Sequence, residues 1–206
     1  MSPRQARRST AQVREAIVRE ATKLFIERGY AGASMNELNA RVGGSKVTLY
    51  KQFGNKKALF SAVLDHVLED HMVQLEKADF DAVELHEGLE AIARLTLSTV
   101  SSPEAIGLWR LLYVEAPNSP ELARLFISRG PARTFAGVER FLAGQVKRKA
   151  LKCRDPAAAA EYFVGMLLHK PMLLRYCERI KPLSKRRLNE ISKRVTTDFL
   201  RMCESL

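Results

Sequence analysis

The fold of this chain is decided by residues 34–60, SMNELNARVGGSKVTLYKQFGNKKALF. Ser34 and Ser45 are favourable N-caps for two short helices, because a serine hydroxyl accepts a hydrogen bond from an amide of the first turn. Gly43 supplies the left-handed backbone that a tight turn between those helices needs. Gly54 ends the second helix, and a third, longer helix begins after it. Two short helices joined by a tight turn are typical of a helix-turn-helix motif.

The two short helices have distinct inner and outer faces. Their apolar residues recur one helical turn apart, which predicts a shared inner face made of Leu38, Val42, Leu49 and Phe53. The outer face of the second helix combines cations, a hydroxyl, a phenol and an aliphatic side chain, namely Lys46, Val47, Thr48, Tyr50 and Lys51. A helix with such an outer face is suited to the major groove of DNA.

This stretch resembles the DNA-binding domain of TetR-family transcription regulators. The matching positions follow the family pattern in order, and they are Ser34, Leu38, Gly43, Ser45, Thr48, Leu49, Tyr50, Phe53, Lys56 and Leu59. Two positions depart from it: Gly44 replaces a small aliphatic residue, and Val47 replaces a glycine that often allows close approach to DNA. The resemblance implies an all-α regulator, usually a repressor, that binds a palindromic operator.

The predicted contacts with double-stranded DNA form two groups. The residues assigned to base edges are Lys46, Val47, Thr48 and Lys51. The residues assigned to phosphates are Ser34, Ser45, Tyr50 and Lys56. For Tyr50, packing within the protein is the alternative. Arg7 and Arg8 belong to a basic N-terminal arm that either reaches DNA or remains a solvated terminus.

The basic charge of the chain is concentrated in its N-terminal part. The 206 residues carry a formal net charge of +11. Residues 1–60 hold 12 Lys or Arg against 4 Glu, a net +8, whereas residues 61–206 hold 22 against 19 acidic residues, a net +3. A solvated basic surface is the alternative explanation. The coincidence with the helix-turn-helix pattern favours binding to DNA phosphates.

Cysteine usage and hydropathy predict the compartment. The three cysteines form no CxxC pair, and they are Cys153, Cys177 and Cys203. Such a scattered, odd set favours a reducing, intracellular setting over a disulfide framework. No stretch approaches the roughly 20 apolar residues of a membrane span, and no apolar run follows the basic N-terminus. We therefore expect a cytoplasmic protein without a membrane partner.

Catalytic and metal-binding patterns are absent from the sequence. The His and Cys residues fall in no recognisable catalytic arrangement, and the Gly43–Lys46 run lacks the spacing of a phosphate-binding loop. His66 and Asp70 lie one turn apart, but no third ligand has a convincing spacing, so an exposed helix pair explains them better than a metal site. We expect neither an enzyme nor a cofactor.

The rest of the chain also has helical periodicity, and no useful stretch alternates with period two. The sequence therefore predicts an all-α fold of about nine helices, with a DNA-binding head at residues 1–55 and a ligand-binding and dimerisation body at residues 56–206. The first helix carries an apolar stripe that is predicted to cover the inner face of the two short helices: Val13, Ile17, Ala21, Leu24 and Phe25. A helix from Lys56 to about Lys77 connects head and body.

Residues 108–135, LWRLLYVEAPNSPELARLFISRGPARTF, resemble the regulatory domain of AefR-like TetR proteins. The resemblance rests on Glu115-Ala116-Pro117, Pro120-Glu121-Leu122, Phe126 and Gly130-Pro131, where the helix either stops or kinks. It implies a small-molecule effector among the middle helices. The predicted lining suits an apolar ligand, with core packing as the alternative for each residue: Trp109, Tyr113, Phe126, Phe163, Met166 and His169.

The last two helices are the predicted homodimer interface. Their apolar residues repeat at near-heptad spacing, and the assigned positions are Phe163, Leu167, Leu174, Leu188, Ile191, Val195, Phe199 and Met202. The family resemblance implies that these helices form a four-helix bundle with a second copy. Packing within one chain is the alternative.

A non-specific nucleoid-type or RNA-binding basic helical protein is the main alternative function. Such a protein would spread its basic charge over the surface and would lack a ligand cavity. It would also lose DNA at moderate salt, because phosphate contacts alone depend strongly on salt.

Overall fold

The computed structural model describes residues 9–43, 45–77, 83–177 and 182–204. Helices are the only regular secondary structure among these residues, and their bounds are α1 Thr10–Gly32, α2 Met35–Val42, α3 Lys46–Phe53, α4 Lys56–Lys77, α5 Leu85–Val100, α6 Pro103–Glu115, α7 Pro120–Arg129, α8 Pro131–Lys147, α9 Pro156–Cys177 and α10 Lys185–Glu204. The all-α prediction is confirmed. There are ten helices rather than about nine, because α7 and α8 are separate helices on either side of Gly130.

The helices α2 and α3 begin at the predicted caps. Ser34 Oγ accepts a hydrogen bond from the Glu37 amide at 3.0 Å, and Ser45 Oγ accepts one from the Val47 amide at 3.2 Å. The remaining side-chain caps are Ser9, Asn55, Ser102, Asp155 and Ser184. Each satisfies an amide that has no partner within its helix.

Glycines end the helices of the head. Gly43 has φ +70°, ψ +23° and closes α2 in the left-handed conformation, as predicted. Gly29 has φ +73°, ψ 170°, so the regular part of α1 ends there, and a kinked segment follows up to Gly32. Residues 29–33 therefore form the turn between α1 and α2.

The structure contains two apolar cores. The first core joins α1, α2, α3 and the start of α4 to α6 and α7, through buried residues that include Phe25, Leu49, Phe60, Leu112 and Phe126. The predicted stripe of α1 lies in this core, which also holds the inner-face residues of α2 and α3. The division at residue 55 remains a prediction, since the core of the head continues into α6 and α7.

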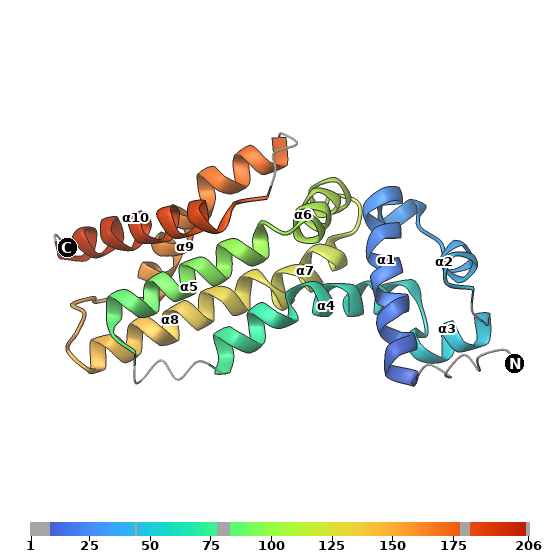
Figure 1. Cartoon of the computed structure of the whole chain (residues 1–206), viewed down its shortest axis with the longest axis horizontal. Coiled ribbons are helices and arrows are strands. Elements are labelled where there is room, and N and C mark those ends of the chain that lie inside the picture. The colour runs from blue at the N-terminus through green and yellow to red at the C-terminus, as the bar shows by residue number, and fades with distance from the viewer. Residues whose placement is uncertain (1–8, 44, 78–82, 178–181, 205–206) are drawn as a thin grey trace, which may run out of the picture.

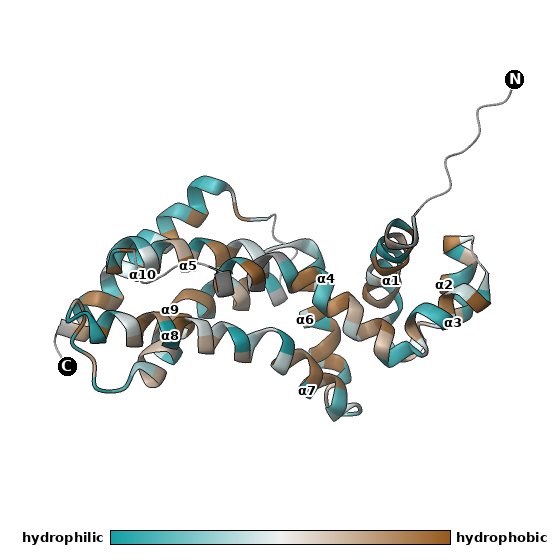
Figure 2. Cartoon of the chain, turned by 90° about the horizontal axis from the view of Figure 1, so that it is seen from below, coloured by the Kyte–Doolittle hydropathy of each residue, from teal (hydrophilic) through white to brown (hydrophobic). Residues whose placement is uncertain are grey.

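The second core lies at the other end of the molecule. It joins the end of α4 to α5, α8, α9 and α10, through residues that include Leu75, Leu97, Phe141, Phe163 and Phe199. Figure 1 shows α1–α3 at one end, α4 running from them into the body, and α5, α8, α9 and α10 at the far end. Figure 2 shows apolar segments on α4, α6 and α7 beside the head, where the first core lies.

Candidate nucleic-acid interface

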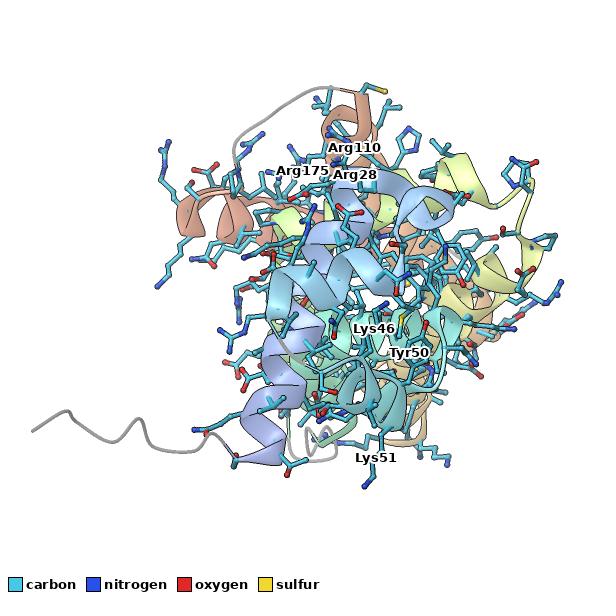
Figure 3. All side chains as sticks on the ribbon, turned by 90° about the vertical axis from the view of Figure 1, so that its right-hand side faces the viewer. Arg28, Lys46, Tyr50, Lys51, Arg110 and Arg175 are labelled. Carbon is cyan, nitrogen blue, oxygen red and sulfur yellow. The ribbon has the colours of Figure 1, made fainter. Side chains whose placement is uncertain are left out.

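The outer face of α3 is exposed, as the sequence predicts. Leu49 and Phe53 are buried in the first core and hold the helix in place. The five predicted outer residues, Lys46, Val47, Thr48, Tyr50 and Lys51, are all exposed. Val47 exposes 75% of its surface and Tyr50 exposes 46%, so both are accessible to DNA. Figure 3, which faces the head, places Lys46, Tyr50 and Lys51 along α3.

Contacts with α1 fix α2 and α3 within the head. Arg41 on α2 forms ion pairs with Glu27 of α1 at 2.8 Å and with Glu37 at 2.9 Å. The guanidinium carbon of Arg14 lies 4.6 Å from the centre of the Phe53 ring, which connects α1 to the end of α3. The ion pairs of Arg41 still reach solvent, which screens them, so apolar packing beneath these contacts supplies most of the stability.

The other predicted DNA residues have different surroundings. Ser34 and Ser45 are exposed, but each hydroxyl already caps its helix, so any phosphate contact would be shared with that role. Arg7 and Arg8 lie outside the described residues.

Lys56 is engaged within the protein, where we had predicted a phosphate contact. Its Nζ donates hydrogen bonds to the carbonyl oxygens of Tyr30 at 2.8 Å, Ala31 at 3.2 Å and Ala33 at 3.0 Å. The ammonium group also lies 4.6 Å from the centre of the Tyr30 ring. A lysine has three N–H donors, and all three point to the end of α1. The sequence did not reveal this role, because the three carbonyls lie more than twenty residues away.

Replacing Lys56 with methionine should lower the free energy of unfolding by about 1–3 kcal/mol, because partly buried carbonyls lose their donors. Urea unfolding measures this change, and Lys57→Met, at an exposed neighbouring position, is the matched control. The salt dependence of DNA binding should stay the same. Unchanged stability, together with a salt slope reduced by about one phosphate contact per protomer, would instead support the phosphate role.

The six predicted ligand residues do not surround one cavity. Trp109, Tyr113 and Phe126 form an aromatic cluster at the head–body contact, with the Trp109 ring centre 4.4 Å from Phe126 and 5.9 Å from Tyr113. Phe163 lies in the second core instead, and Met166 and His169 are exposed on α9. Helical spacing identified apolar residues but not the helix that each one faces.

A different cleft lies between α4 and the α7–α8 corner. Its volume is about 330 Å³, and its lining residues are Asp65, Leu68, Glu69, Val73, Arg129 and Arg133. Arg129 Nη1 lies 2.9 Å from Asp65 Oδ1, so an ion pair joins α7 to α4 along this cleft. The sequence did not predict this cleft, because its charged residues resemble ordinary helix-surface charges until the helices pack together.

Most predicted dimer residues lie inside the single chain. The buried ones are Phe163, Leu167, Ile191, Val195 and Phe199, which belong to the second core. Leu188 and Met202 are partly buried against the same core. The five buried residues thus lie in the core of the single chain and not on an exposed face, because α10 turns its apolar stripe towards α5 and α9. An interface role for Leu188 and Met202 stays a prediction. Leu174 is exposed on α9.

The described residues contain no group of three His, Cys, Asp or Glu side chains that could hold a metal ion. The side chain of Asp70 lies outside the described part of the structure. That His66 and Asp70 form an exposed helix pair and not a metal site therefore stays a prediction. Among the described helices, none combines the length and the apolar character that a membrane span requires.

Two family models match the sequence. Residues 17–63 match the model of bacterial regulatory proteins of the tetR family. Residues 87–203 match the model of the C-terminal domain of AefR-like transcriptional repressors. The first match covers the helix-turn-helix, and the second covers α5 to α10.

Curated relatives match parts of the chain. The HTH-type transcriptional repressor ComR of Escherichia coli is 41% identical over 56 residues, which cover 27% of this chain and 27% of ComR. The HTH-type transcriptional regulator BetI of Agrobacterium fabrum is 28% identical over 115 residues, which cover 55% of this chain and 56% of BetI. The chain thus spans between a quarter and somewhat more than half of the length of these relatives.

Solved structures match nearly the whole chain. A TetR-family transcriptional regulator from Mesorhizobium loti is 28% identical, with a TM-score of 0.76 and coverage of 95% of this chain and 98% of that one. The flavonoid-responsive regulator FrrA is 27% identical, with a TM-score of 0.75 and coverage of 94% and 97%. With a family model that covers more than half of its residues, this chain belongs to the TetR family of bacterial transcription regulators and has an AefR-like C-terminal domain.

Proposed function

We propose that this protein represses transcription in the cytoplasm by binding a palindromic operator as a homodimer, and that a small-molecule effector releases it. The exposed outer face of α3, held by buried Leu49 and Phe53, is the observation that carries this proposal. Each copy of α3 would enter one major groove, so the two half-sites would lie about one helical turn apart or slightly more.

The roles of the α3 side chains follow from their chemistry. Lys46, Thr48 and Lys51 would donate hydrogen bonds to base edges, and Val47 would contact a thymine methyl group. Tyr50 would bind a phosphate and fix the register of the helix on the duplex. Val47 stands where TetR-family proteins often have glycine, so its side chain occupies part of the surface that faces DNA. The operator sequence should therefore differ from the operators of relatives that have glycine at this position.

The dimer would form through the outward face of α9. Tyr162, Met166, His169 and Leu173 are exposed and follow one another at spacings of 4, 3 and 4 residues, the pattern of a left-handed helix contact. A β-carbon at Gly165 would meet nothing within 4 Å, so the neighbouring surface is open to a second copy. Leu174 borders the same face, which keeps one predicted interface residue in this proposal.

Charged residues on this face should separate the dimer. The double variant Met166→Glu/Leu173→Glu is expected to sediment as a folded monomer, because an apolar contact would have to bury carboxylates without partners. The control is Val114→Glu/Ile127→Glu, which places the same charges at exposed positions on α6 and α7. A variant that sediments as the wild-type dimer does would contradict the assignment of this face.

The effector would bind at the cleft between α4 and the α7–α8 corner. This cleft adjoins α4, the helix that leads to the head, and its ion pair would respond to a ligand there. Its charged lining favours an effector with polar or ionised groups over the apolar ligand that the sequence predicts. Since FrrA is flavonoid-responsive, phenolic compounds are the first class to test for release of the operator.

Sequencing of retained genomic DNA tests the proposed function. The purified protein is incubated with sheared DNA from its source and excess competitor, and the bound fragments are sequenced. Recovery of one palindromic site, lost in a Lys46→Ala/Tyr50→Ala variant, is the expected result.

Indiscriminate retention would instead support a non-specific nucleoid-type protein. One observation favours this alternative: the turn after α8 carries exposed cations far from the head, at Lys147, Arg148, Lys149, Lys152 and Arg154. Binding through such a surface would depend on salt but not on DNA sequence.

A further inference from the structure

Glu115 connects the body to the turn between α1 and α2. It is the last residue of α6, and its Oε1 accepts a hydrogen bond from the Ala31 amide at 3.0 Å. The same oxygen would lie only 3.2 Å from a β-carbon at Gly29, where the backbone has φ +73°. A residue with a side chain would be strained there by its backbone and crowded by Glu115. The turn therefore fits closely against the end of α6.

The same turn is held from a second helix. Lys56, at the start of α4, donates to the carbonyls of Tyr30, Ala31 and Ala33. Ala31 thus uses its amide towards α6 and its carbonyl towards α4. A displacement of α6 relative to α4 that exceeds the reach of these two side chains lengthens or breaks one of the hydrogen bonds, because each depends on distance and angle.

Apolar side chains also pack α6 against α1. A β-carbon at Gly107 of α6 would lie 2.7 Å from Ile26 Cδ1 of α1, so the two helices approach closely. Leu108 and Leu112 of α6 share the first core with Phe25. Apolar packing has little directional preference, whereas a hydrogen bond has a defined geometry. The Glu115 carboxylate therefore fixes how the end of α6 meets the turn.

We propose that Glu115 is a positioning residue that couples α6 to the orientation of α2 and α3. The helix α2 begins at Met35, directly after the turn, and α3 follows it, so a change at the turn alters how α3 is presented. This inference rests on the proposed function. Because coupling between two sites is reciprocal, DNA bound to α3 must also act on α6.

The only tryptophan, Trp109, lies on α6 and reports on this coupling. We expect the operator fragment recovered from genomic DNA to change Trp109 fluorescence in the wild-type protein. In Glu115→Ala the change should be lost, while operator affinity stays within about tenfold of the wild-type value. Glu115→Gln should restore the fluorescence change, because its amide oxygen can still accept a hydrogen bond from Ala31.

Glu139→Ala, which removes an exposed carboxylate from α8, is the matched control and should keep the wild-type response. If Glu115→Ala unfolds, Glu115→Asp is the substitute, since it shortens the side chain by one methylene group. A Glu115→Ala or Glu115→Asp protein with the full fluorescence change overturns the inference, and so does a Glu115→Gln protein that lacks it. If the wild-type protein retains no specific operator, the proposed function itself fails, which is a separate result.

Discussion

Replacing both Lys46 and Tyr50 with alanine is expected to lower operator affinity by at least about 100-fold. The proposed dimer would present α3 twice, so the double variant would remove two contacts from each half-site. Individual base and phosphate contacts contribute about 1–3 kcal/mol each, and several lost together exceed the roughly 2.7 kcal/mol that a 100-fold change requires. Fluorescence anisotropy with the labelled operator measures the change at fixed salt.

The fold should survive this double substitution, because both side chains are exposed on α3. Thermal unfolding of the variant should therefore match that of the wild type within about 0.5 kcal/mol. The control is Lys185→Ala/Lys193→Ala, which removes two exposed lysines from α10 and should retain operator binding. Equal losses in the two double variants would mean that general charge, not the face of α3, determines binding.

The second large effect concerns stability. Phe163→Ala should lower the free energy of unfolding by about 3–5 kcal/mol, because it removes a buried aromatic ring and leaves a cavity. Phe163 exposes 0% of its surface, and its ring centre lies 5.1 Å from that of Phe199. The two rings join α9 to α10 within one chain. Urea unfolding at one protein concentration measures the loss.

Phe135→Ala serves as the comparison, since Phe135 is exposed on α8 and its loss should cost far less. The result would also decide between the two explanations of the α9 residues. If Phe163→Ala separated the dimer without changing the stability of the chain, the predicted interface role would stand and the intramolecular role would not.

For α9, the sequence did not predict which residues face the core of the chain. Residues 162–174 are apolar on more than one side, so periodicity predicted a buried face but could not say which side met the protein core and which met a second copy. Phe163 and Leu167 were assigned to the dimer, yet they lie in the second core, while Tyr162 and Met166 are exposed. Only the packing of α8 and α10 against one side of α9 makes that distinction.

The sequence by itself determined the helix boundaries of the head, the all-α class and the outer face of α3. These features depend on short-range physics: serine hydroxyls cap the next turn, Gly43 takes the left-handed conformation, and apolar residues recur every three or four positions. The same local rules identified the buried stripe of α1. No distant partner was needed for any of them.

Tertiary structure alone decided what the long-range polar side chains contact. Lys56 matched a family position, but its ammonium group meets three carbonyls at the end of α1. Glu115 meets an amide 84 residues away, and Asp65 meets Arg129 at a distance of 64 residues. A long charged side chain can satisfy its hydrogen bonds with water, DNA or protein at similar free energy, so its sequence position does not fix its partner. The packing of the helices does, because it determines which donors and acceptors lie within reach.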